Sequence, residues 1–280
     1  MTNKLSEKTS LSFIGCGVMA ESIVAGLLRE EIVSSSQIAA SHPRADRRTE
    51  LETKYGIKTF AENSDAANAF PSSESIVILC VKPQRIRGVL KELTSAIKPG
   101  QLIISIVAGA GIETISETLN SNLVVRAMPN TPSQIGAGMT AWTCSPDVDE
   151  DHKKQVKIML SALGKELFVE TENMIDMATS LSATGPTYIF MVMEAMTDAG
   201  VHLGFSREIS KELVQQTMLG SVQFAIESQK HPAELRNMVT SPGGTSAEAI
   251  YQMEKGALRT VLSKAIYGAY KRAVELGKRK

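Results

Sequence analysis

The chain has 280 residues, enough for one large or two smaller domains, and we expect two. Its 30 basic and 30 acidic residues cancel, so no net charge draws it to nucleic acid or to an anionic membrane. Its three widely spaced cysteines suggest neither a disulfide framework nor a metal site, and no apolar run is long enough to span a bilayer. We therefore expect a cytoplasmic protein that acts on a small molecule.

The first half alternates short apolar runs with amphipathic stretches. We expect strands at residues 11–15, 37–40, 75–81, 102–107, 123–127, 138–143 and 166–169. We expect helices at residues 19–30, 44–55, 86–97, 112–119 and 150–163. This β-α-β-α order predicts an α/β fold in which helices cover a parallel sheet.

The second half is predicted to be entirely helical. After about residue 170 the apolar runs give way to long stretches rich in Ala, Met and Leu, at residues 175–203 and 207–228. Pro232 fits the first position of a short helix at residues 233–239, and a last helical region follows residues 241–244 and ends near residue 276. The methionines are typical of an adaptable core or subunit interface. We predict two domains, residues 1–170 and 171–280.

The first glycine loop, residues 15–20, links the first strand to the first helix with the pattern G-x-G-x-x-A. Gly15 would permit the tight turn, Gly17 would let a pyrophosphate approach the backbone, and Ala20 would keep the helix close to the strand. Glycines also mark ordinary turns, but this motif opens a β-α-β unit. It therefore predicts a dinucleotide site at a helix N-terminus.

The end of the second strand indicates which dinucleotide binds. A fold that prefers NAD carries Asp or Glu there, whereas this chain carries Ser41, His42 and Arg44, which can donate to a 2′-phosphate. We therefore expect NADPH as the cofactor, with NADH possible as a second one. Arg47 and Arg48 lie one turn further on and are either phosphate contacts or a solvated helix face.

Two loops end predicted strands at the carboxyl edge of the sheet, where such folds bind ligands. They are residues 81–83 and 106–109. Each either lines the nicotinamide end of the crevice or is an ordinary strand end, and the residues alone leave both alternatives open.

The second glycine turn, residues 241–246, precedes the last helical region and has the sequence S-P-G-G-T-S. Thr245 and Glu248 have capping-box spacing, so one interpretation of the segment is a helix start and nothing more. A glycine-rich turn before a helix is also suited to binding an anion such as a substrate carboxylate. The residues alone leave both interpretations open.

Six segments together resemble, in order and spacing, the pyrroline-5-carboxylate reductase family. They are residues 13–20, 81–83, 104–109, 126–132 (R-A-M-P-N-T-P), 182–188 (S-A-T-G-P-T-Y) and 241–246. The resemblance implies an NADPH-dependent oxidoreductase that reduces 1-pyrroline-5-carboxylate to L-proline, the last step of proline biosynthesis. It implies an N-terminal NADP-binding Rossmann domain and a C-terminal helical domain for substrate binding and dimerisation. The chain would then form a homodimer or a larger homo-oligomer such as a decamer, with active sites that combine both domains.

The resemblance also assigns site residues. The implied cofactor contacts are Gly15, Gly17, Val18, Met19, Ser41, His42, Arg44, Asn63, Val81, Lys82, Pro83, Val107 and Ala108. The implied substrate contacts are Glu172, Thr245 and Ser246, and we expect Thr245 and Ser246 to act in catalysis. Ser241, Gly243, Gly244 and the Thr245 amide are our hypothesis for the grip on the substrate carboxylate. Two positions depart from the family pattern: Met238 stands where some members have Asn, and Ser246 stands where Thr is common.

Two other functions were weighed against this one. A β-hydroxyacid or 6-phosphogluconate type dehydrogenase has the same two-domain plan but needs a Lys four residues after a Gly, and an Asn four residues later. Here Ile189 and Met193 occupy those positions after Gly185, so that acid–base machinery is missing. A catalytically silent NADPH-binding regulator is the second alternative, because a fold does not guarantee activity. Such a regulator would not need the second glycine turn.

Overall fold

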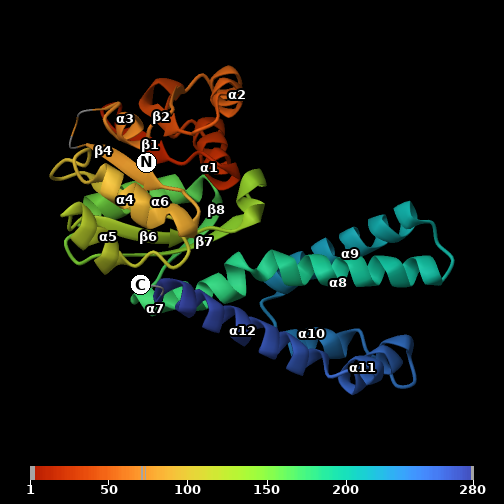
Figure 1. The fold of residues 1–280 in the computed structure, drawn as a ribbon. Helices are drawn as coiled ribbons and strands as arrows, with labels where there is room; N and C mark the ends of the chain where they lie inside the picture. Colours follow the sequence, from red (N-terminus) through yellow and green to blue (C-terminus); the bar gives the residue numbers. More distant parts are fainter. Residues whose placement is uncertain (1–3, 71, 73, 279–280) are drawn as a thin grey trace. The chain divides into compact units, whose positions relative to one another are not determined.

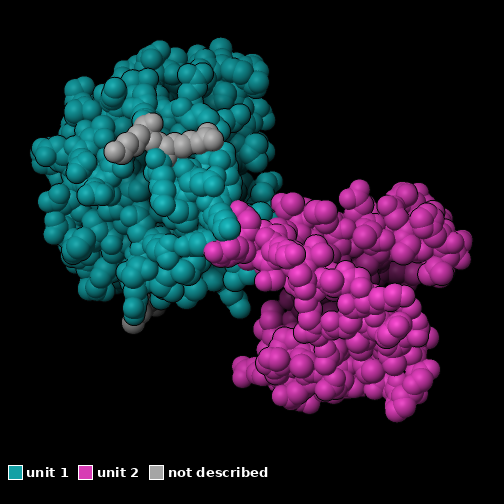
Figure 2. Space-filling model, turned by 60° about the horizontal axis from the view of Figure 1, so that its bottom comes forward, with its two compact units in different colours: residues 1–184, 269–280 teal, residues 185–268 magenta. Residues whose placement is uncertain are grey.

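The structure is a computed structural model that describes residues 4–70, 72 and 74–278. The chain divides into two compact units, shown in different colours in Figure 2. The first comprises Met1–Thr184 and Ala269–Lys280, and the second comprises Gly185–Gly268. The helical segments on either side of the second unit therefore group with the sheet.

The first unit is built on one eight-stranded sheet (Figure 1), with the strand order β3-β2-β1-β4-β5-β6-β7-β8. The strands are β1 (Ser10–Ile14), β2 (Ile38–Ser41), β3 (Lys58–Phe60), β4 (Ser75–Leu79), β5 (Leu102–Ser105), β6 (Val124–Met128), β7 (Gly138–Cys144) and β8 (Gly164–Phe168). All neighbours pair in parallel except β6 and β7, which are antiparallel. The predicted Rossmann-type parallel sheet is confirmed.

Helices cover both faces of this sheet because its strands are apolar on both sides. One face packs against α1 (Val18–Arg29), α2 (Ala45–Tyr55) and α6 (Glu150–Ser161). The other packs against α3 (Asn63–Ala67), α4 (Ile86–Leu93) and α5 (Ile112–Leu119). Alternation along β4 shows the division, since Ile76 and Ile78 belong to the first core and Val77 and Leu79 to the second.

The second half is helical, as predicted, but with more interruptions than the sequence pattern indicates. Its helices are α7 (Glu172–Ala178), α8 (Gly185–His202), α9 (Arg207–Ser228), α10 (Pro232–Met238), α11 (Thr245–Lys255) and α12 (Leu258–Lys278). A π-helical turn, Thr179–Ala183, interrupts the helix predicted over residues 175–203. Ala257, with a φ of 54°, divides the last helical region into α11 and α12. Among the described residues, no helix is both long and apolar enough to cross a membrane.

The end of α12 packs against the loop that follows β5. Gly109 in that loop has a φ of +74°, and a Cβ atom there would lie 2.8 Å from the carbonyl carbon of Leu276 and 2.9 Å from the amide nitrogen of Gly277. Because no side chain fits in that space, the two backbones are in direct contact. The last turns of α12 thus belong to the first unit.

Candidate functional site

The first glycine loop adopts the conformation that its glycines were predicted to allow. Gly15 has a φ of +86°, and a Cβ atom there would lie 2.5 Å from Cγ1 of Val81. Gly17 is the N-cap of α1, no side chain caps that helix, and a Cβ atom at Gly17 would meet no protein atom within 4 Å. Ala20 is buried against the sheet. The loop therefore presents the start of α1 to open space, as binding of a pyrophosphate requires.

Three predicted cofactor loops begin at the same edge of the sheet. The register pairs Ile14 with Leu79 and Leu79 with Ser105, which are the last residues of β1, β4 and β5. The chain order reverses between β1 and β4, which is where doubly wound folds bind their ligands. Val107 is buried in the core and Ala108 is half-buried, so Ala108 is the more accessible of the two candidates.

A chain of hydrogen bonds links the first glycine loop to Ser41 and Asn63. The Ser41 hydroxyl accepts a hydrogen bond from the Gly15 amide at 2.9 Å and donates to Oδ1 of Asn63 at 2.8 Å. Asn63 in turn donates to Glu92 at 2.7 Å. Ser41 is only 1% exposed, so its hydroxyl is engaged inside the protein and holds the loop in place. A direct phosphate contact by Ser41 stays a prediction.

A cavity of about 450 Å³, called here the 2′-phosphate cavity, opens beside the start of α1. Its lining residues are Gly17, Val18, Glu21, His42, Pro43, Arg44, Arg47 and Glu50. Burial lowers the pKa of His42, and its Nδ1 accepts from the Arg44 amide at 3.3 Å. The Arg44 guanidinium is exposed and pairs with Asp46 at 3.2 Å. Both predicted phosphate-binding residues, His42 and Arg44, therefore face one cavity.

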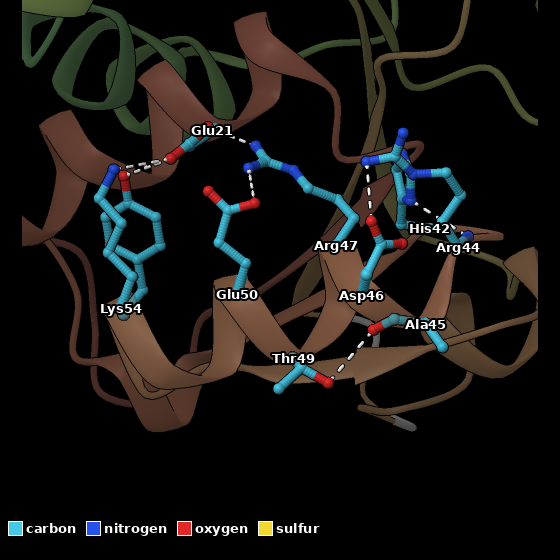
Figure 3. Close-up of polar contacts among 10 residues, drawn as sticks. Glu21, His42, Arg44, Ala45, Asp46, Arg47, Thr49, Glu50 and Lys54 are labelled. Atoms are coloured by element: carbon cyan, nitrogen blue, oxygen red, sulfur yellow. Dashed lines mark hydrogen bonds and ion pairs between the residues drawn. The ribbon is translucent and has the colours of Figure 1, made fainter.

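Arg47 and Arg48 both have protein partners. Arg47 pairs with Glu21 and, at 2.7 Å, with Glu50, and its side chain is 13% exposed (Figure 3). Arg48 donates to the carbonyl oxygens of His42 and Pro43 at 2.9 and 3.1 Å. The alternative of a solvated helix face is therefore wrong for Arg47, and Arg48 shapes the loop that carries His42.

Glu21 joins α1 to α2 beneath the 2′-phosphate cavity. Besides Arg47, its carboxylate accepts from Lys54 at 3.0 Å and from the Tyr55 hydroxyl at 2.8 Å. Burial alone would raise the pKa of Glu21, but hydrogen bonds from these three donors lower it to about 2. Glu21 was missed from the sequence because its partners lie 26 to 34 residues away.

In the second unit, the second glycine turn leads into α11 without a capping side chain. Gly243 has a φ of +70°, and a Cβ atom on Gly244 would lie 2.5 Å from the Ser241 hydroxyl. Gly244 is the N-cap, Thr245 is the first helical residue, and no side chain caps the helix. The predicted capping-box alternative is therefore wrong, and Glu248 instead accepts from Gln252 at 2.8 Å. The uncapped start of α11 is suited to a carboxylate.

Glu172 lies in the first unit and has structural partners. Its Oε1 accepts from the Ile112 amide at the start of α5 and from Arg126, both at 2.9 Å. Arg126 also contacts Asp176 at 2.6 Å, and its side chain is only 4% exposed. Sequence reasoning gave Arg126 no role, although a charge within an apolar strand was a usable signal. The predicted substrate contact of Glu172 would use the carboxylate that Arg126 holds in place.

Two family models match the chain. One, described as pyrroline-5-carboxylate reductase dimerisation, matches residues 172–276. The other, described as NADP oxidoreductase coenzyme F420-dependent, matches residues 10–109.

Several relatives similar over nearly their whole length are named as pyrroline-5-carboxylate or pyrroline carboxylate reductases. A pyrroline-5-carboxylate reductase from Synechocystis is 38% identical over 96% of this chain and 98% of its own. A pyrroline-5-carboxylate reductase from Pseudomonas aeruginosa is 39% identical over 95% of this chain and 96% of its own. Among solved structures, the Coxiella burnetii pyrroline-5-carboxylate reductase has a TM-score of 0.86 at 36% identity, covering 97% of this chain and 99% of its own. The Plasmodium falciparum pyrroline carboxylate reductase, solved with NADP bound, has a TM-score of 0.88 at 28% identity, covering 98% and 100%.

Proposed function

This chain belongs to the pyrroline-5-carboxylate reductase family, and we propose that it reduces 1-pyrroline-5-carboxylate to L-proline with NADPH, the last step of proline biosynthesis. Relatives of that name match almost the whole chain at up to 39% identity. The observation that carries the substrate assignment is the uncapped start of α11, which offers its first amides to a carboxylate.

The residues around the first glycine loop fit NADPH. Gly15 and Gly17 leave room for the pyrophosphate, and Arg44 lies in the cavity predicted for the 2′-phosphate. The remaining predicted contacts are Val18, Met19, Ser41, His42, Asn63, Val81, Lys82, Pro83, Val107 and Ala108. When bound, NADPH supplies the hydride, and these residues fix its orientation.

The second glycine turn would hold the substrate. We assign the grip on the carboxylate to Ser241, Gly243, Gly244 and the Thr245 amide, and the hydrogen bond to the ring nitrogen to the Ser246 hydroxyl. The imine is the better electrophile when its nitrogen is protonated, and it can arrive in that state. The protein therefore needs to orient the substrate more than it needs a strong acid. Glu172 would complete the set of substrate contacts.

One assay separates this function from a silent NADPH-binding protein. Oxidation of NADPH is followed by absorbance after 1-pyrroline-5-carboxylate is added to the folded protein. Steady consumption and formation of proline are expected. If the protein binds NADPH without consuming it, the reductase function is rejected and the catalytically silent NADPH-binding regulator is the remaining alternative.

The role of Ser246 has its own test. Ser246→Ala should lower kcat by about tenfold or more while the Kd for NADPH stays unchanged, because the lost hydroxyl contacts the substrate alone. Ser161→Ala is the matched control, since that hydroxyl donates only within α6. Near-normal turnover of Ser246→Ala would reject the assignment.

We propose that residues 1–170 form the NADP-binding domain and residues 171–280 the substrate-binding and dimerisation domain. Large apolar side chains exposed on α8 and α9 of the single chain support self-association, among them Phe190, Met191, Leu219, Val222, Phe224 and Ile226. We expect a homodimer, or a decamer built from dimers, and sedimentation velocity would distinguish the two. A cytoplasmic location fits the three free cysteines.

A further inference from the structure

The 2′-phosphate cavity contains two arginines whose charges are already matched by carboxylates. Arg44 pairs with Asp46, and Arg47 lies between Glu21 and Glu50 (Figure 3). Burial lowers the pKa of His42, which disfavours its charged form. An incoming 2′-phosphate, which carries a charge of about −1.5 to −2, therefore gains full attraction only where it displaces a carboxylate from an arginine.

The two partners of Arg47 differ in how firmly they are held. Glu21 is 17% exposed and is fixed by Lys54 and Tyr55 as well as by Arg47. Glu50 is 55% exposed and pairs with Arg47 through Nη1 at 2.7 Å. The Nη1 end of the guanidinium is therefore the end that can change partner, while Nη2 stays on Glu21.

We propose that Glu50 sets how strongly NADPH is preferred over NADH, by competing with the 2′-phosphate for Nη1 of Arg47. NADPH must displace Glu50 from Nη1 of Arg47 before the phosphate can bind that end of the guanidinium. NADH carries a hydroxyl at that position and leaves the Arg47–Glu50 pair intact. Glu50 thus weakens the binding of NADPH but not that of NADH. Arg47 determines cofactor specificity because its Nη1 is the atom for which Glu50 and the 2′-phosphate compete. This inference rests on the proposed NADPH-dependent function.

The direct test is the substitution Glu50→Gln, with the Kd values of NADPH and NADH measured by quenching of protein fluorescence. An exposed ion pair contributes little free energy, so the Kd for NADPH should fall by about two- to fivefold while the Kd for NADH stays constant. Glu52→Gln is the matched control. It removes the same charge from the same helix, but Glu52 is exposed outside the cavity and bonds to Thr59.

Repeating the Glu50→Gln substitution in the Arg47→Ala variant tests whether its effect on the Kd for NADPH acts through Arg47. In Arg47→Ala, NADPH should bind more weakly than in the wild type, and adding Glu50→Gln should change the Kd for NADPH less than it does in the wild type, because the contested guanidinium is gone. Circular dichroism confirms that each variant is folded before binding is measured.

Three results would overturn the inference. They are an equal change in both Kd values with Glu50→Gln, the same NADPH effect with Glu52→Gln, or a full Glu50→Gln effect in the Arg47→Ala background. Failure of the proposed function looks different, since the wild type would then not bind NADPH or would not oxidise it with 1-pyrroline-5-carboxylate.

Discussion

The substitution Glu21→Gln tests how the two nucleotide-binding helices are joined. A Gln side chain keeps the size of Glu21 but loses the charge that Arg47, Lys54 and Tyr55 stabilise. In the folded state this carboxyl titrates near 2, against an ordinary value of 4.5. That difference corresponds to about 2 to 3 kcal/mol of stability at pH 7, after allowance for screening of the exposed Lys54.

The pH dependence gives this prediction its sign. Because the folded-state pKa lies below the unfolded one, the contribution of Glu21 is complete above the unfolded pKa, near 4.5, and is lost as the pH falls toward 2. Urea unfolding of wild type and variant should therefore show a gap in the free energy of unfolding that narrows by about half between pH 5 and pH 3. The protein concentration is fixed, since dissociation of an oligomer shifts the apparent stability.

A control and a clear negative result complete the experiment. Glu31→Gln removes a carboxylate from the exposed Lys4–Glu31 pair and should leave the free energy of unfolding nearly unchanged. A Glu21→Gln gap that stays constant from pH 7 to pH 3 would show that the lost stability comes from packing and not from the charge.

Two other substitutions test the site. Gly17→Ala should keep the wild-type melting temperature, because its new methyl group meets no protein atom. It should bind NADPH about tenfold more weakly or worse, because that methyl group points where the pyrophosphate would lie. A large fall in melting temperature would contradict this prediction. Arg126→Met should lower the free energy of unfolding by about 3 to 5 kcal/mol, since Glu172 and Asp176 lose the cation that neutralises them. Adding Asp176→Asn should recover part of that loss in urea unfolding, and no recovery would refute the charge argument.

The sheet was predictable because its strands are short apolar runs separated by helices with clear periodicity. β3 and α3 were missed since Lys58–Phe60 and Asn63–Ala67 are too short to show a period. The π-helical turn at Thr179–Ala183 was missed for a different reason, because it keeps the composition of the helices on either side. Local pattern thus predicts the longer strands and helices, but neither the shortest elements nor the place where a long helix is interrupted.

The backbone part of the site was predictable, and its side-chain part was not. Gly15 and Gly17 are required by local geometry, which a short motif reports. The pair between Arg47 and Glu21 depends on how α1 and α2 pack, because Glu21 lies 26 residues before Arg47 on α1. The capping box at Thr245 and Glu248 failed because its spacing fits equally well one residue inside the helix as at its cap. Side-chain pairs between different elements can be predicted only when the fold is known, because the local sequence pattern does not report them.

The contact between Gly109 and the end of α12 affects how the protein is made. Synthesis proceeds from the N-terminus, so the loop after β5 leaves the ribosome more than 150 residues before Leu276 and Gly277 arrive to pack on it. The first unit therefore stays incomplete on the ribosome until the end of α12 has been made. A chain stopped before α12 would carry every predicted cofactor residue and still lack the backbone that packs on Gly109.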